Sequence, residues 1–154
     1  MPLHFSVEEL ANRRQRACAE MKRRGLDALL LFRQESMYYL TGYDTFGYVY
    51  FQCLVLTADG RMVLLTRAPD LRQARYTSVI EDIRIWVDRE GANPAEELKS
   101  ILAEAGLAGQ RLGVEYDAYG LTAAVGKKLD ASLEGFATLE DASDLVSRLR
   151  LVKS

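Results

Sequence analysis

The first 25 residues of the chain carry the apolar pattern of an amphipathic helix. Leu10 and Met21 recur at positions near the helical spacing, with charged residues between them. Ser6 followed by Glu9 is typical of a capping-box start, and Gly25 is typical of a helix end. We therefore predict one long helix between these two signals.

Strand and helix patterns alternate over the next thirty residues. Residues 27–32 form a short continuous apolar run, which is the pattern of a strand covered on both faces. Residues 35–41 have the length of a short helix that Gly42 closes. Residues 48–57 are rich in aromatic and β-branched side chains, and this composition favours a longer strand.

A hairpin and a further strand follow. The pair Asp59-Gly60 lies between two apolar runs, which is the strongest short-range signal of a β-hairpin. Residues 62–66 should therefore pair antiparallel with the strand before them. Residues 69–75 predict a short helix, and residues 83–88 alternate with a period of two, as a half-buried strand does.

The rest of the chain repeats this alternation. Asn93 and Pro94 are a capping residue and a first-turn proline, and Gly106 ends the helix that they open. The pattern then predicts strands at 111–115 and 135–139, a helix at 121–129, and a final helix from residue 141. Six strands and four principal helices predict an α/β fold, a mixed six-stranded sheet with helices on both faces, in one domain over residues 1–154.

Composition and charge limit the partners and the location. Hydrophobic residues make up 49% of the 154, enough for one core. The net charge of −2 is mixed along the chain, so we expect no nucleic-acid and no membrane partner. No apolar run approaches the ~20 residues that span a bilayer, and the chain starts without a signal-peptide pattern, so we expect a cytoplasmic protein. We interpret the basic residues of the first helix as a solvated face because glutamates share the segment: Arg13, Arg14, Arg16, Lys22, Arg23 and Arg24.

Side chains suited to catalysis are scarce. The only histidine is His4, which lies ahead of the first helix, so a Ser/His or Cys/His centre is close to excluded. His4 has no acidic or sulfur neighbours and receives no metal-binding role. Cys18 and Cys53 lack metal-ligand spacing, and we expect both to be reduced packing residues. No phosphate-binding glycine motif occurs, so we predict no nucleotide site. Since the residues also offer no Ser/His or Cys/His centre and no metal-ligand set, we predict no catalytic residue and no metal ligand in this chain.

Half of the aromatic side chains lie between residues 38 and 51. Tyr39 and Phe51 fit a packing role in the core. If Phe51 faces one way in a strand, then Tyr48, Tyr50 and Gln52 face the other way and form an amphipathic aromatic stripe. Such a stripe suits an interface or the wall of a pocket.

Five motifs, taken in order, resemble the amino-terminal domain of the creatinase, aminopeptidase P and prolidase family. They are Arg13 and Arg16 in the opening helix, Gly25-Leu-Asp-Ala-Leu-Leu-Leu, Tyr39-Leu-Thr-Gly42-Tyr, Leu112-Gly-Val-Glu115 and Leu149-Arg-Leu-Val-Lys-Ser154. The resemblance covers nearly the whole chain and implies a ribonuclease H-like fold. It also implies a pita-bread catalytic domain after residue 154, in which two Asp, one His and two Glu bind two divalent metal ions (Mn, Zn or Co).

The resemblance further implies a role for the aromatic segment. In creatinase, residues after the Tyr-x-x-Gly motif enter the active site of the neighbouring subunit, and an arginine among them holds the substrate carboxylate. The corresponding segment here has no arginine, and Phe46, Tyr48 and Tyr50 are the expected pocket residues of the partner subunit in a homodimer. The implied function is that of a non-catalytic domain, joined to its own catalytic domain, in a two-metal hydrolase that cleaves C–N bonds.

The expected substrate is an Xaa-Pro dipeptide, as for Xaa-Pro dipeptidases and aminopeptidase P. A small cyclic or guanidino compound is the alternative, because residues 43–53 and 84–91 look closer to ectoine-hydrolase-like members. A non-enzymatic peptide-binding or protein-binding module is an alternative of another class, since relatives of this architecture exist that have lost catalysis. A receiver or flavodoxin-like domain would need acids or a phosphate loop after the first strand, and Phe32-Arg33-Gln34 supplies neither.

Overall fold

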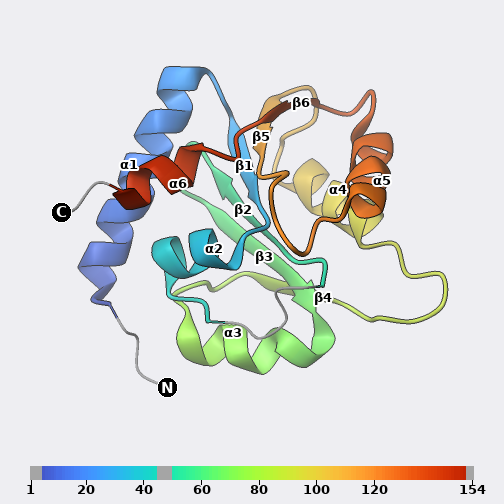
Figure 1. Ribbon diagram of the computed structural model, residues 1–154, viewed down its shortest axis with the longest axis horizontal. Helices are drawn as coiled ribbons and strands as arrows, with labels where there is room; N and C mark the ends of the chain where they lie inside the picture. The colour runs from blue at the N-terminus through green and yellow to red at the C-terminus, as the bar shows by residue number, and fades with distance from the viewer. Residues whose placement is uncertain (1–4, 45–49, 152–154) are drawn as a thin grey trace.

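The computed structural model describes residues 5–44 and 50–151, which form one sheet flanked by helices (Figure 1). The strands are β1 (Ala28–Leu31), β2 (Cys53–Thr57), β3 (Met62–Arg67), β4 (Ile83–Trp86), β5 (Arg111–Val114) and β6 (Thr138–Asp141). The helices are α1 (Val7–Arg24), α2 (Gln34–Thr41), the 3₁₀ turn η1 (Ala68–Asp70), α3 (Leu71–Thr77), α4 (Pro94–Glu104), α5 (Ala123–Leu133) and α6 (Leu145–Leu151).

The sheet is mixed, with the strand order β4-β3-β2-β1-β5-β6. The pairs β1–β2 and β2–β3 are antiparallel, whereas β1–β5, β3–β4 and β5–β6 are parallel. All four residues of β1 are buried, as the continuous apolar run of residues 27–32 predicts for an interior strand. The predicted α/β class and mixed six-stranded sheet are therefore confirmed.

Each face of the sheet carries its own core. Alternate strand residues such as Leu30 and Val55 pack with α4 and α5, which supply Leu98 and Leu129. The opposite face packs against α1, α2, α3 and α6, and Figure 1 shows α1 and α6 across the sheet from α4 and α5. The period of two along the strands thus feeds two apolar layers, and the predicted arrangement of helices on both faces is confirmed.

Local signals in the sequence fix several element ends. The Ser6 hydroxyl accepts a hydrogen bond from the Glu9 amide at 3.1 Å, and Gly25 ends α1 with φ of 73°. Gly60 lies in the β2–β3 hairpin with φ of 94°, a left-handed conformation that strains side chains other than glycine. The predicted helix start, helix end and hairpin are confirmed.

Some predicted boundaries are wrong. The second strand begins at Cys53 rather than at residue 48, because residues 50–52 leave the ladder to make side-chain contacts described below. The last strand spans 138–141 rather than 135–139, since Gly135, with φ of 75°, belongs to the turn after α5. The helix predicted at 121–129 spans Ala123–Leu133 instead, because Thr122 is its cap. The final helix begins at residue 145 rather than 141.

The interpretation of the basic residues in α1 as a solvated face holds for Lys22 and Arg23, which are exposed, but is wrong for Arg13 and Arg14. Arg13 is only 9% exposed, and its guanidinium donates to the Tyr39 carbonyl at 3.0 Å. Arg14 donates to the Leu40 carbonyl at 2.9 Å. The last carbonyls of a helix lack partners within the helix, so these two arginines complete the end of α2.

The structure also bears on the predictions about the two cysteines, a membrane-spanning segment and His4. Cys53 is buried, Cys18 is partly buried, and both thiols are free. No helix among residues 5–44 and 50–151 is long and apolar enough to cross a membrane. His4 lies outside the described residues, so its expected lack of a role stays a prediction.

Candidate functional site

The aromatic segment between α2 and β2 is the candidate site. Of its three predicted pocket residues, Tyr50 is the one that the structure describes. Phe46 and Tyr48, the other two predicted pocket residues, lie outside the described residues. Tyr50 is 41% exposed, and the guanidinium carbon of Arg67 lies 3.7 Å from the centroid of its ring. An exposed tyrosine stacked on a guanidinium presents an aromatic face and a positive charge together.

A buried polar cluster holds the segment in place. The Tyr43 hydroxyl donates to Gln52 Oε1 at 2.9 Å, and the Thr66 hydroxyl donates to the same oxygen at 3.0 Å. All three residues are buried. The prediction that Gln52 lies on the outward face with Tyr50 is therefore wrong, because two buried hydroxyls draw its amide inward.

The two ends of the segment are tied to different elements. The Asp44 amide donates to the Thr77 hydroxyl of α3 at 2.9 Å. The Trp86 indole N–H of β4 donates to the Phe51 carbonyl at 2.9 Å. Phe51 is buried and packs edge-on against Phe32, with ring centroids 5.4 Å apart, so its predicted packing role is confirmed. Tyr39, which packs partly buried against the other core, also fits its predicted role.

Arg67 is the charged group of the site. Its side chain is 20% exposed, and Nε lies 3.7 Å from an Asp70 carboxylate oxygen, which is too long for a hydrogen bond. Within the described residues, both of these buried atoms have no hydrogen-bond partner. The guanidinium is thus held beside Tyr50 and within ion-pair distance of Asp70, and its buried Nε has no hydrogen bond among the described residues. Sequence reasoning missed Arg67 because β3, and not the aromatic segment, supplies it.

A buried charged residue whose contacts the sequence did not indicate is Glu115, which ends the fourth family motif and follows β5. Its side chain is fully buried. One carboxylate oxygen accepts from the amides of Phe32 and Arg33 at 3.1 and 3.0 Å, and the other accepts from the Ser36 hydroxyl at 2.5 Å. Burial raises the pKa of Glu115 to about 7, although these donors act in the opposite direction. Glu115 thereby joins the end of β5 to the start of α2, the helix that leads into the aromatic segment.

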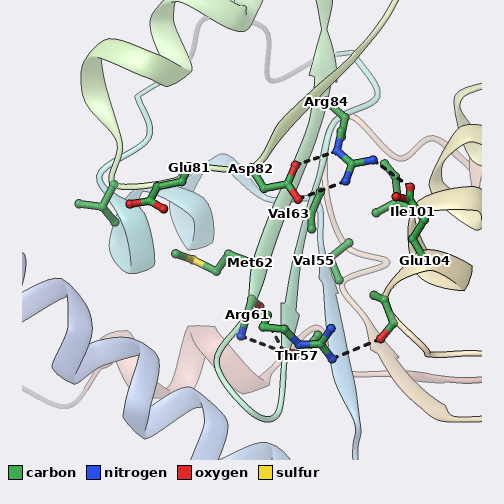
Figure 2. Close-up of a pocket in the computed structure, with 12 residues that line it drawn as sticks. Val55, Thr57, Arg61, Met62, Val63, Glu81, Asp82, Arg84, Ile101 and Glu104 are labelled. Atoms are coloured by element: carbon green, nitrogen blue, oxygen red, sulfur yellow. Dashed lines mark hydrogen bonds and ion pairs between the residues drawn. The ribbon is translucent and has the colours of Figure 1, made fainter.

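A groove between β3, the start of β4 and α4 is another concave feature, with a volume of about 520 Å³ (Figure 2). Val55, Val63 and Ile101 line its apolar part. Arg84 crosses it to reach both Asp82, at 2.7 Å, and Glu104, at 2.9 Å. Since Arg84 is paired on both sides, its charge links the sheet to α4.

The described residues do not fit a metal centre. Among residues 5–44 and 50–151, no group of three or more His, Cys, Asp or Glu side chains is placed to hold a metal ion. A two-metal hydrolase needs several such ligands around each ion.

Comparison with known proteins shows the family to which the chain belongs. The creatinase/prolidase N-terminal domain model matches residues 13–152. The chain belongs to this family. The family that the five motifs predict is thus confirmed, and the match extends over nearly the whole described fold.

Individual relatives agree with this assignment. Ectoine hydrolase from Halomonas elongata is 31% identical over 159 residues, which cover 99% of this chain and 40% of that protein. The N-terminal domain of the cytoplasmic peptidase PepQ from Mycobacterium tuberculosis superposes with a TM-score of 0.71 at 27% identity, over 91% of this chain and 99% of that one. An Xaa-Pro aminopeptidase structure from Streptococcus pyogenes gives 0.72 at 25% identity, over 94% and 100%. The chain spans about 40% of the length of the curated relatives it matches.

Proposed function

We propose that this chain is the non-catalytic amino-terminal domain of a cytoplasmic, homodimeric two-metal hydrolase that cleaves C–N bonds. In this proposal its aromatic segment, with Phe46, Tyr48 and Tyr50, lines the substrate pocket of the neighbouring subunit. The metal ions (Mn, Zn or Co) and their ligands belong to a catalytic domain beyond this chain. Xaa-Pro dipeptides are the proposed substrates, since peptidases that act on Xaa-Pro bonds share this fold.

The observation that carries the proposal is the combination of the family fold with an exposed, anchored Tyr50. A tyrosine needed only for core packing would be buried, as Tyr43 is. Tyr50 is instead 41% exposed, while the two ends of the segment are held by a partly buried hydrogen bond at Asp44 and a buried one at Phe51. A rigid support under an exposed aromatic ring is what a preorganised pocket wall requires.

Arg67 supports the same proposal. The aromatic segment contains no arginine, but β3 brings one to within 3.7 Å of the Tyr50 ring. A guanidinium can bind a carboxylate in a two-pronged geometry, and an Xaa-Pro dipeptide ends in a carboxylate. We assign Tyr50 to contact the substrate's apolar ring and Arg67 to bind its carboxylate.

The proposal is tested in the longer protein with two variants. Tyr50→Ala should lower kcat/KM by ~10-fold, the size of one lost transition-state contact, with the melting temperature nearly unchanged because the ring is exposed. Arg67→Ala should lower kcat/KM for a dipeptide but have little effect on its carboxamide, which lacks the negative charge. Equal losses on both substrates, or a loss that follows only from unfolding, would contradict the assignment.

Ectoine is a second candidate substrate, favoured by the 31% identity to ectoine hydrolase. It also carries a carboxylate, so the role of Arg67 is the same in both cases. Parallel assays of the longer protein with an Xaa-Pro dipeptide and with ectoine decide between them. Turnover of neither compound, together with stable binding of peptides, would instead favour a non-enzymatic binding module.

A further inference from the structure

The edge strand β4 carries an exposed apolar surface. It ends the strand order, and its one neighbour in the described sheet is β3. Ile85 is 44% exposed, and Val87, which directly follows the strand, is 49% exposed. An edge with apolar side chains and free backbone groups is a template for pairing with another strand. A partner strand would bury the apolar side chains and also form hydrogen bonds with the free backbone groups.

The backbone phase of β4 shows which groups are free for a partner. The Leu64 amide donates to the Asp82 carbonyl at 2.9 Å, and Leu64 aligns with Ile83 in the parallel register. Even-numbered residues of β4 therefore direct their N–H and C=O groups toward β3. Ile83, Ile85 and Val87 direct theirs outward, because backbone groups alternate along a strand.

We propose that β4 pairs antiparallel with β4 of a second copy, around a two-fold axis at Trp86. In this register Ile85 lies opposite Val87 of the second copy, and the outward backbone groups of both residues form hydrogen bonds. Arg84 lies opposite Asp88 of the second copy, so this pairing is also complementary in charge. A surface that is its own complement is what a two-fold contact requires.

Charge and backbone phase select this register over its neighbours. With the axis at Ile85, Asp82 would lie opposite Asp88 of the second copy, and like charges across a strand pair are destabilising. With the axis between these two positions, outward groups would face residues whose groups point to β3. In the proposed register the position opposite Asp82 is Glu90 of the second copy, which lies in the turn of residues 89–91 and outside the strand, so no acid is paired with Asp82.

This edge lies next to the candidate pocket wall. Trp86 bonds to the Phe51 carbonyl, and Arg67, which stacks on Tyr50, aligns with Trp86 in the β3–β4 register. The inference rests on the homodimer of the proposed function and names the surface that forms it. Its tests use this chain alone and measure association, so failure of the edge leaves the activity tests of the pocket standing.

The first test is the oligomeric state of the 154-residue chain by sedimentation from ~10 µM to ~1 mM, because a single strand pairing is smaller than a standard stable interface. A reversible monomer–dimer equilibrium is expected, and Ile85→Lys should weaken it by ~10-fold or more. The control Tyr119→Lys changes a side chain that is 79% exposed and lies outside β4, and should leave the equilibrium as it is. A strictly monomeric parent chain, or equal association of Ile85→Lys, overturns the inference.

The second test fixes the register by oxidative cross-linking in a Cys18→Ser background. Opposed hydrogen-bonded residues have Cα atoms ~5.5 Å apart, within the range of a disulfide. The double variant Ile85→Cys/Val87→Cys should form a covalent dimer, while each single variant should not. A covalent dimer from Ile85→Cys alone would place the axis at Ile85 and overturn the proposed register, as would no cross-link from the double variant.

Discussion

Replacement of Glu115 by glutamine should change how the stability of the domain depends on pH. Folding raises the pKa of this carboxyl to about 7 from 4.5. The folded state therefore binds the proton more tightly than the unfolded state does. The stabilisation by the protonated group is fully present below pH 4.5 and is lost as the pH rises toward 7. The difference in pKa corresponds to about 3 kcal/mol of folding free energy. Solvent screening does not reduce this value, because the side chain is fully buried.

Glutamine reproduces the protonated form of the network. Its oxygen can accept from the amides of Phe32 and Arg33, and its N–H₂ group can donate to the Ser36 hydroxyl. The free energy of unfolding of Glu115→Gln relative to the parent should rise by about 3 kcal/mol between pH 4 and pH 8. Glu115→Ala should instead be destabilised by about 2–4 kcal/mol at low pH, because buried amide donors lose their acceptor.

Urea-induced unfolding followed through Trp86, the only tryptophan, measures these differences at several pH values. The exposed Glu90→Gln variant is the matched control for the loss of one carboxylate from the chain. A flat difference for Glu115→Gln would refute the reasoning, since it would mean that folding does not change the pKa of Glu115.

Three further predictions follow from packing, hydrogen bonding and ligand chemistry. Gly113→Ala should lower the free energy of unfolding by about 1–3 kcal/mol, because a β-carbon would lie 2.7 Å from Ala142 Cβ, whereas Gly126→Ala in α5 has nothing within 4 Å and should raise it by up to about 1 kcal/mol. Thermal unfolding of the pair checks both signs. Tyr43→Phe should cost about 1 kcal/mol in the same assay through loss of its bond to Gln52, and an unchanged stability would contradict the role of the buried cluster. Calorimetric titration of this chain with Mn²⁺ or Zn²⁺ should give no stoichiometric submicromolar binding, and such binding would reveal ligands that we do not recognise.

The parts of the fold that the sequence predicts well are those set by local chemistry. Ser6, Gly25 and Gly60 act through the backbone within a few residues, so their roles can be read from neighbouring positions. The apolar run of β1 is similarly local, since four consecutive buried residues need only the period of the strand. These features sufficed for the order of elements and for the two-sided sheet.

The parts that sequence reasoning missed depend on contacts between distant segments. Glu115 finds its amide donors 82 and 83 residues away, so its neighbours in the sequence do not show which groups its carboxylate binds. Arg13 and Arg14 bond to carbonyls 26 residues away, so their pattern in the sequence looks like that of a solvated helix face. Gln52 turns inward for the same reason, because its hydroxyl partners come from a loop and from β3. Such long-range hydrogen bonds override the alternation that a strand pattern predicts.

The pocket wall in trans is the central claim, and subunit exchange in the longer protein tests it most directly. A Tyr50→Ala variant is mixed with a variant that lacks a metal ligand in the catalytic domain, and the subunits are allowed to exchange. Half of the dimers should then be mixed, and each mixed dimer should hold one site with both halves intact. Activity should recover to about a quarter of the parent value. Activity that stays at the average of the two separate variants would show that Tyr50 serves only its own subunit and would contradict the account.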